Sequence, residues 1–226
     1  VFAEASYQNS SITGITDNVG AITGAVLSGS STDDTTLALT VAWSSTSSGA
    51  PSSTTLYVWQ VSPNGTYSQV GTVTADNKNS GNFIVTTSTL ATNGAWGFFV
   101  NTSSATPTAS PNPDTFSIVL DTINPTVSSV AITSATGVQN SSLNAGDVVS
   151  VTVTMNEAVT VTGTPQLTLN VGGTNLTAFY ASGSGTTALV FTYTIQAGET
   201  DANGISIAAD SLALNSGSIT DAAGNA

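Results

Sequence analysis

The chain has 226 residues, of which 39% are hydrophobic and only 6% are charged, and its thirteen acids face one lysine and no histidine, for a net charge of −12. This is enough apolar material to build one large or two medium cores, which excludes a disordered chain. Nucleic-acid partners are excluded because almost nothing can neutralise phosphates, and the absence of cysteine excludes disulfides and thiolate metal sites.

The first half predicts short strands and no helix, because apolar residues alternate with polar ones and Gly, Asn, Ser and Pro interrupt the runs. Residues 1–11 are ambiguous, and residues 44–54 form a Ser/Thr/Gly/Pro loop that is long for a compact β domain. We expect strands at 37–43, 56–61, 67–74, 83–87, 95–100 and 115–120. This density of short strands is typical of a β-sandwich.

Residues 120–126, Leu-Asp-Thr-Ile-Asn-Pro-Thr, separate the two halves, with one strand pattern ending before them and another beginning after them. Pro125 fixes its own φ and pushes Asn124 toward an extended conformation. A short, stiff, acidic joint between two strands predicts a domain junction, with one domain at 1–120 and another at 121–226. An acidic joint is also a place where a cation can lock two domains together.

The second half repeats this logic with a different sequence. Strands are expected at 127–132, 148–154, 158–162, 166–171, 175–181, 187–195, 204–208 and 217–220. Residues 148–155 and 189–195 alternate cleanly, which places one strand face on a core and the other toward water. The halves are not recognisable copies of each other, so we expect an all-β chain of two different β-sandwiches in tandem.

The composition offers little for catalysis. Without His or Cys, a serine nucleophile lacks its usual base and a cysteine nucleophile does not exist. The single amine, Lys78, lies in a polar Asn/Ser/Gly turn, where it is solvated. A glycosidase-like carboxylate pair stays open, but the acids lie in polar turns and not in the apolar setting that suits a general acid. We expect no enzymatic activity and no catalytic residue.

The acids are the first functional signal, because Asp, Glu, Asn and backbone carbonyl oxygens are the ligands that Ca²⁺ selects. The candidate ligands are Asp17, Asp33, Asp34 and Asp76 in the first half, Asp121 at the junction, and Asp147, Glu157, Glu199, Asp201, Asn203 and Asp221 in the second half. The alternative is that each acid is a turn residue or a solubilising charge. The set as a whole favours several Ca²⁺ ions, because the strand faces carry Thr, Ser and Asn in place of acids.

Aromatic residues are the second signal, since all three Trp (Trp43, Trp59 and Trp96) fall in the first half. Tyr57 and Trp59 share a strand face opposite Leu56 and Val58, so this aromatic pair is expected outside the core. Two interpretations remain open. Trp residues most often fill a sandwich core, whereas a Trp beside a polar loop can form a platform for a sugar or a peptide.

Several motifs carry a family resemblance that covers nearly all of residues 12–226. ITDNVG at 15–20, TDDT at 32–35, GTVTAD at 71–76 and LDTINPT at 120–126 resemble parts of the bacterial Ig-like repeats of giant biofilm adhesins. NEAV at 156–159, PQLTL at 165–169, GETD at 198–201 and DAAGN at 221–225 resemble another Ig-like repeat of the same large secreted proteins.

The resemblance implies two tandem Ig-like β-sandwiches from a type I-secreted, RTX-type adhesin at a Gram-negative cell surface. In such proteins neighbouring Ig-like domains form a stalk, and Ca²⁺ at the junctions stiffens it for cell adhesion and biofilm formation. The chain is then expected to be an extracellular segment of a longer polypeptide, with no direct membrane insertion. The polar loop at 44–54, the extra aromatics and the Pro-bearing stretch at 101–114 depart from the repeat, and they keep open a module that holds a carbohydrate or a peptide.

Overall fold

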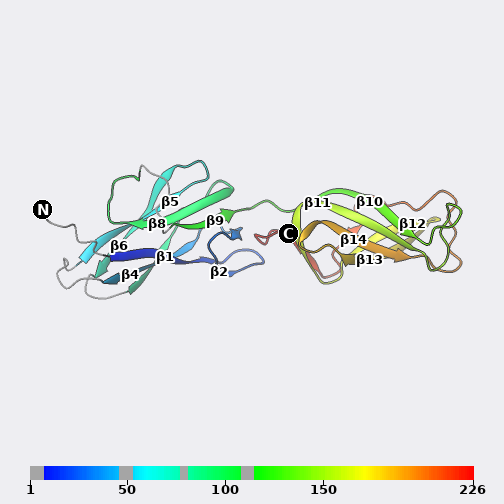
Figure 1. Cartoon of the computed structure of the whole chain (residues 1–226), viewed down its shortest axis with the longest axis horizontal. Coiled ribbons are helices and arrows are strands. Elements are labelled where there is room, and N and C mark those ends of the chain that lie inside the picture. The colour runs from blue at the N-terminus through cyan, green and yellow to red at the C-terminus, as the bar shows by residue number, and fades with distance from the viewer. Residues whose placement is uncertain (1–7, 46–52, 77–80, 108–114) are drawn as a thin grey trace. The chain divides into compact units, whose positions relative to one another are not determined.

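Strands, turns and loops make up the whole described part of this computed structural model, which comprises residues 8–45, 53–76, 81–107 and 115–226 (Figure 1). The structure is therefore all-β across these residues, as the alternating pattern predicts, and it is consistent with a β-sandwich. None of the described segments is a helix that could cross a membrane. The chain divides into two compact units, the first unit Val1–Thr122 and the second unit Ile123–Ala226.

The described residues of the first unit form two sheets. Its strands are β1 (Gln8–Asp17), β2 (Gly24–Val26), β3 (Ser31–Thr32), β4 (Ala38–Ser45), β5 (Ser53–Val61), β6 (Tyr67–Asp76), β7 (Gly81–Thr86), β8 (Gly94–Asn101) and β9 (Phe116–Leu120). One sheet has the order β2-β1-β4-β7, and the other has the order β3-β9-β8-β5-β6. All these pairs are antiparallel except β3 with β9, which run parallel.

The core of the first unit lies between these sheets. Alternate residues of β4, Leu39 and Val41, are fully buried, and they share one cluster with Leu56 and Val58 of β5 and with Phe98 of β8. Burying each such side chain contributes roughly 1.5–3 kcal/mol to folding, which explains why the alternating runs determine the sheet faces.

Strand β1 is absent from the predicted elements, and its apolar spacing explains why. Ile12 and Ile15 are three residues apart, which is out of phase with a regular strand, yet both are buried. The pairing of β1 with β4 shifts between Ile12 and Gly14, so an extra residue restores the phase. This β-bulge lets both isoleucines face the core, and a period-two pattern cannot reveal it.

The second unit contains one seven-stranded sheet. Its strands are β10 (Val127–Thr136), β11 (Val148–Thr162), β12 (Gln166–Val171), β13 (Thr174–Ser182), β14 (Thr186–Thr194), β15 (Leu212–Ala213) and β16 (Ser218–Thr220). The order is β10-β11-β14-β13-β12-β15, and β16 pairs with the second half of β11. Val151, Val153, Leu169, Leu189 and Phe191 are fully buried and form the centre of its core.

Three predicted strands of the second half differ from the structure. The strands expected at 148–154 and 158–162 are one strand, β11, whose pairing with β14 is interrupted between Thr154 and Val159. The strand expected at 204–208 is wrong: Ser206 makes only an isolated bridge with Asn170, and β15 pairs with β12 further along the chain. Apolar residues at alternate positions there pack on the core from a loop, which periodicity cannot distinguish from a strand.

Some predicted features fall outside the described residues. They are residues 46–52 of the loop expected at 44–54, Lys78 in its polar turn, and residues 108–114 of the Pro-bearing stretch.

Candidate metal centre

Two acids of the first unit, Asp17 and Asp34, are joined through one buried threonine. Thr32 donates its Oγ1–H to Asp17 Oδ2 at 2.6 Å, and its Oγ1 accepts the backbone N–H of Asp34 at 3.2 Å. All three residues are at least 96% buried. Because a buried polar group is costly unless it is hydrogen-bonded, this Asp–Thr–Asp arrangement fixes the end of β1 against β3.

The remaining oxygens of these two carboxylates close the neighbouring turns. Asp17 Oδ1 accepts the N–H of Val19 at 2.9 Å, and Asp34 Oδ1 accepts the N–H of Thr36 at 2.8 Å. Asp34 Oδ2 accepts the N–H of Asn18 at 3.2 Å. Both acids therefore have a structural role in the turns that follow β1 and β3, whether or not a cation also binds them.

Asp33 and Asp121 lie at the same end of the first unit. A Cβ added to Gly20, which has a φ of 72°, would meet Asp33 Oδ2 at 1.9 Å, so the Asp33 side chain packs directly on that glycine. The backbone N–H of Asp121 donates to the Thr32 carbonyl at 2.9 Å and fixes Asp121 at the end of β9. Thus Asp17, Asp33, Asp34 and Asp121 gather around one threonine.

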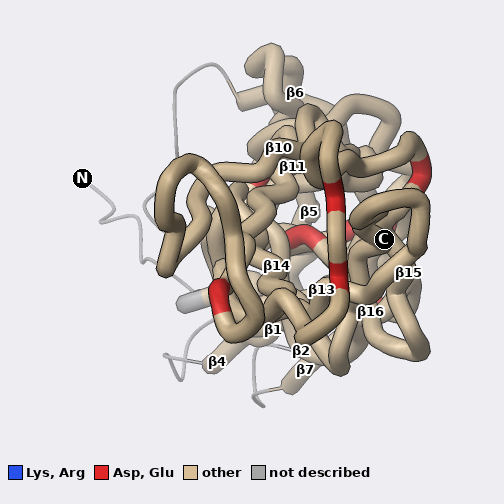
Figure 2. Tube along the Cα trace, turned by 90° about the vertical axis from the view of Figure 1, so that its right-hand side faces the viewer, with Lys and Arg blue, Asp and Glu red and all other residues tan. Residues whose placement is uncertain are grey.

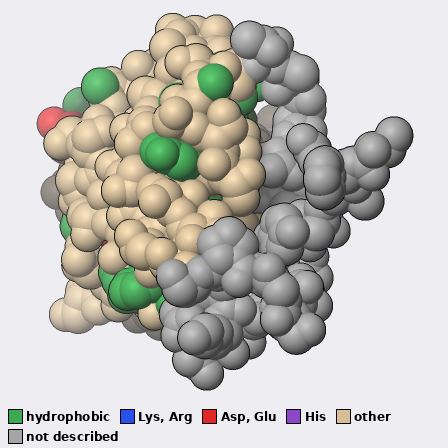
Figure 3. Space-filling view, turned by 90° about the vertical axis from the view of Figure 1, so that its left-hand side faces the viewer, with side chains coloured by type: hydrophobic (Ala, Val, Ile, Leu, Met, Phe, Trp, Pro, Cys, Tyr) green, Lys and Arg blue, Asp and Glu red, His purple; other side chains and the backbone are tan. Residues whose placement is uncertain are grey.

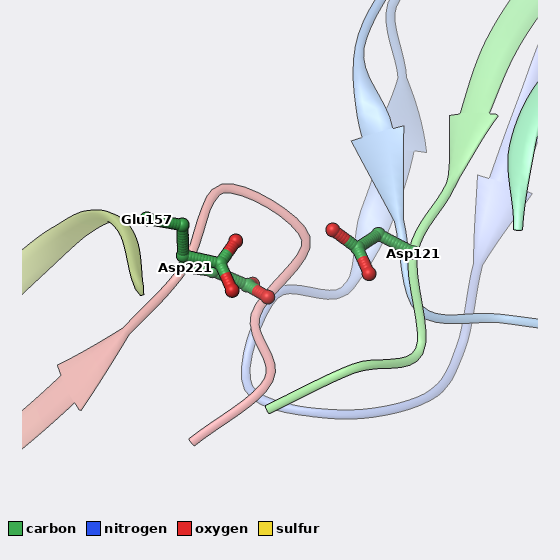
Figure 4. Close-up of side chains that lie close together, drawn as sticks. All are labelled: Asp121, Glu157 and Asp221. Atoms are coloured by element: carbon green, nitrogen blue, oxygen red, sulfur yellow. The ribbon is translucent and has the colours of Figure 1, made fainter. Parts of the chain in front are cut away.

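In the second unit, the structure brings Glu157 and Asp221 together from distant parts of the sequence. Glu157 lies where β11 changes its partner, and Asp221 directly follows β16, which pairs with that part of β11. Their carboxylate oxygens lie within 4.8 Å of each other (Figure 4). Asp221 is 2% exposed, whereas Glu157 is half-buried.

The two oxygens of Asp221 have different surroundings. Oδ1 accepts three backbone N–H groups, from Ala223 and Gly224 at 2.8 Å each and from Asn225 at 3.0 Å. Oδ2 accepts the Asn225 side-chain amide at 2.8 Å. Because a carboxylate oxygen has two lone pairs, Oδ2 retains acceptor capacity, and Oδ1 serves the C-terminal turn.

The chemistry of this pair fits a hard cation. Two carboxylates at this separation repel each other unless a positive charge lies between them. The second unit contains no Lys or Arg to supply that charge, and among the described residues the hydrogen bond to Glu157 Oε1 comes from a neutral amide, Asn156 Nδ2, at 3.2 Å. Oxygen donors of this kind suit Ca²⁺ or Mg²⁺. Ca²⁺ takes six to eight oxygens, so the pair supplies part of a coordination shell.

The linker residues that belong to the second unit are fixed beside this pair. The Thr126 backbone N–H donates to Asn156 Oδ1 at 2.6 Å, and the Asn156 N–H donates back to the Thr126 carbonyl at 2.9 Å. Asn124 Nδ2 donates to the carbonyl of Ala226 at 2.7 Å. The residues after the junction are therefore bonded to the neighbours of both Glu157 and Asp221.

The other candidate acids of the second unit lie on loops outside this pair, Asp147 before β11 and Glu199 and Asp201 after β14, and Figure 2 shows the acids as red segments of the trace. Asp147 Oδ2 accepts the Asn144 N–H at 2.7 Å. Glu199 Oε2 accepts the Gln196 N–H at 2.9 Å, and Oε1 accepts the Tyr193 hydroxyl. Asp147 and Glu199 thus each accept a backbone N–H from their own turn.

Asp201 and Asn203, which the sequence pattern places in one cation-wrapping loop, are bonded to each other instead. Asp201 Oδ1 accepts the backbone N–H groups of Asn203 at 3.1 Å and Gly204 at 2.9 Å, while Asn203 itself is exposed. Glu199 and Asp201 both line a cavity of about 360 Å³. Asp76 is the last residue of β6, and its side chain lies outside the described residues.

Two pKa values reflect these loop contacts. Burial, followed by the hydrogen bond to Glu199 and its negative charge, raises the pKa of Tyr193 to about 12. The backbone N–H of Gly172 lowers the pKa of Asp201, and the N–H groups of Asn203 and Gly204 add to the effect although desolvation opposes it. Asp201 is therefore held in its charged form by backbone dipoles.

The aromatic residues of the first unit divide between two environments. Trp43 and Trp96 belong to the core cluster. The ring of Trp43 also stacks on the ring of Phe83, with 4.9 Å between the ring centroids. Trp59 was expected outside the core; it does not belong to that cluster, but it is only 4% exposed and is therefore buried. The indole is therefore not an open platform, and Tyr57 beside it is half-buried.

Two further aromatics of the first half, Phe99 and Tyr67, form a group with Trp59. Phe99 is directly opposite it on β8 and is also 4% exposed, and Tyr67 meets Phe99 edge-to-face at 6.1 Å. Trp59 and Phe99 lie opposite each other and so share one face of the sheet. This can be recognised only once the pairing register of β5 with β8 is known. Figure 3, which views one end of the first unit, shows hydrophobic side chains only as small separate patches among the described atoms.

Comparisons with known proteins give little guidance. No family model matches the sequence, and no curated protein matches it. Among solved structures, the C-terminal globular domain of an oligosaccharyltransferase from Pyrococcus abyssi aligns at 12% identity with a TM-score of 0.28, over 93% of this chain and 46% of that one. This chain thus spans less than half of that structure, and a TM-score this low carries no argument about fold or function.

Proposed function

We propose that this chain is a calcium-stiffened extender segment of a large secreted cell-surface adhesin, built from two Ig-like β-sandwiches. The observation that carries the proposal is the Glu157–Asp221 carboxylate pair, which has no basic residue in its unit to balance it and lies beside the linker. A hard cation is the partner that such a pair favours. The acidic composition and the resemblance to adhesin repeats support the extracellular setting.

Asp121 is the residue that would extend this site to the first unit. It lies three residues before Asn124 in the sequence, in the junction where an acidic joint is expected to hold a cation. Without Ca²⁺, the negative charges of Asp121, Glu157 and Asp221 repel one another and the linker is free to bend. With Ca²⁺, one ion shared by these carboxylates would restrict the angle between the units.

Such a site would be stabilising only where Ca²⁺ is abundant. Extracellular calcium modules bind with dissociation constants of about 10⁻⁴–10⁻³ M. A ligand that binds only the folded state at about one hundred times its dissociation constant adds roughly 2.7 kcal/mol of stability. The stalk would therefore be stiff outside the cell and would soften when calcium is removed.

Isothermal titration calorimetry with Ca²⁺ tests this proposal. We expect saturable binding to the wild-type chain, at least a tenfold weaker affinity for Glu157→Gln, and unchanged affinity for Asp210→Asn. Asp210 is an exposed acid of the same unit, so Asp210→Asn removes the same charge without touching the pair. Equal weakening by both variants would mean that Ca²⁺ responds only to overall charge, and the proposal would fail.

A second candidate function is a module that binds a carbohydrate or a peptide through the first unit. The observation in its favour is the Trp59 indole Nε1–H, which is buried and finds no hydrogen-bond acceptor among the described residues. A buried donor without an acceptor costs free energy, and a ligand oxygen would satisfy it once the residues that cover the indole move aside. A glycan and peptide array distinguishes the two candidates. A ligand-binding module should bind a ligand saturably and bind it more weakly after Tyr57→Ala, whereas a pure extender should bind none.

A further inference from the structure

The two edge strands of the second unit's sheet, β10 and β15, do not pair with each other in the described structure. Among the described strands, β10 pairs with β11 alone, and β15 ends the opposite side of the sheet order. Between β10 and the segment that leads into β15 lies a groove of about 500 Å³. Val127 and Val130 line one wall, and Leu167, Ile207 and Leu212 line the other.

The groove is apolar because β10 presents its core-facing side chains to it. Val127, Val130 and Ile132 pair across β11 with Met155, Val153 and Val151, all of which are at least 94% buried. The three β10 residues are nevertheless 45%, 38% and 42% exposed. The apolar side chains of β11 are thus buried, whereas those of β10 on the same face stay partly exposed. One more strand beside β10 would bury them.

The backbone of β10 adds hydrogen-bonding capacity at the same place. In an antiparallel pair, alternate residues direct their N–H and C=O groups away from the partner strand. The pairing with β11 shifts between Val127 and Ser129 and again between Ile132 and Ser134, so residues 129–132 form the regular part of this edge. An added strand would pair there over about 13 Å, at roughly 3.4 Å per residue.

Charge determines what kind of strand fits. Asp210 lies on the groove wall and is exposed, and the second unit has six acids without one basic residue. A second copy of this chain would bring another net charge of −12 against it, which opposes association. A partner strand that alternates apolar residues with Lys or Arg would fill the groove with one face and approach the carboxylate with the other.

We propose that the β10 edge and its groove are a docking site for an extended peptide segment of a partner protein, in which apolar residues alternate with basic ones. Binding occurs by strand addition at residues 129–132, with apolar side chains placed between Val130 and Leu212. This site is independent of the calcium pair, since it uses neither Glu157 nor Asp221.

Fluorescence anisotropy with a short labelled peptide that alternates valine and lysine tests the proposal on the full chain. We expect saturable binding to the wild type, at least tenfold weaker binding to Val130→Asp, and wild-type binding to Phe179→Asp. Phe179 is an exposed apolar residue of β13 outside the groove, so its variant controls for a new surface charge. A peptide with the same composition but with its valines grouped together should bind at least tenfold more weakly, because only alternation matches the edge.

Two further measurements keep the test decisive if Val130→Asp does not fold. Asp210→Asn should weaken binding several-fold, and peptide addition should slow amide hydrogen exchange at residues 129–132. Equal binding of the two peptides, or unchanged exchange along β10, would overturn the proposal. The proposal would also be overturned if the chain dimerised with increasing concentration and Asp210→Asn strengthened that dimer, because the groove would then be an interface between copies.

Discussion

At the scale of single residues, the carboxylates of this chain first serve its turns. Asp17, Asp34 and Asp221 each accept backbone N–H groups from residues just beyond them. These bonds explain why the acids cluster at strand ends, which the sequence alone attributes equally well to metal binding. Asp221 differs from the other two because its carboxylate, besides closing a turn, lies close to a second carboxylate, that of Glu157.

The variant Asp221→Asn should lower the free energy of unfolding of the second unit by about 1–3 kcal/mol even in the presence of a chelator. A neutral amide oxygen is a weaker acceptor for the three N–H groups, and the new NH₂ would face the Asn225 amide. Urea unfolding followed by tyrosine fluorescence measures this. Asp210→Asn should change stability by less than about 0.5 kcal/mol, because that residue is exposed.

The Tyr193–Glu199 contact predicts a loss of stability at high pH. The folded-state pKa of Tyr193 is about 12, above the usual value of about 10, so the folded state holds the proton more tightly. The stabilising effect is complete below pH 10 and disappears as the pH rises through 12. Thermal unfolding across this range should show a shallower decline for Tyr193→Phe than for the wild type. Tyr180→Phe, which removes a phenol that contacts no carboxylate in the described structure, should decline like the wild type.

At the scale of elements, the sequence predicts those strands whose apolar residues alternate without interruption. Strands β4, β5, β12 and β14 lie close to their expected positions because one face of each is buried. Strand β1 was missed because its bulge breaks the alternation, and β15 was missed because two residues carry no period. The fold class is thus readable from periodicity, but bulges and short edge strands depend on partners that are distant in the sequence.

The β12–β13 turn offers a matched pair of glycine substitutions. A Cβ on Gly172, which has a φ of 56°, would meet the Thr200 carbonyl oxygen at 1.9 Å, whereas a Cβ on Gly173, with a φ of 86°, meets nothing within 4 Å. Gly172→Ala should therefore destabilise the second unit by on the order of 3 kcal/mol, and Gly173→Ala by about 1 kcal/mol. Differential scanning calorimetry of both variants measures the difference, and equal melting temperatures would contradict the close contact between this turn and Thr200.

At the scale of the whole molecule, the candidate metal ligands could be named from the sequence but not grouped. Glu157 and Asp221 come together only because β16 pairs with the second half of β11, and that pairing has no local sequence signal. In the loop 199–204, which has the more suggestive spacing, Asp201 Oδ1 accepts two N–H groups of the loop's own backbone, whereas Asp201 Oδ2 is buried without a hydrogen-bond partner among the described residues. The junction at 120–126 is a prediction from the sequence, where a proline and an acid interrupt two clear strand patterns.

The most direct test of the calcium-stiffened extender is small-angle X-ray scattering of the whole chain in millimolar Ca²⁺ and then with chelator, for the wild type and for Glu157→Gln. We predict that Ca²⁺ narrows the range of conformations that fits the wild-type scattering, that chelation widens it, and that Glu157→Gln stays wide in both conditions. Scattering of the wild type that does not change with Ca²⁺ would contradict the account, and the acids would then be turn residues and surface charge alone.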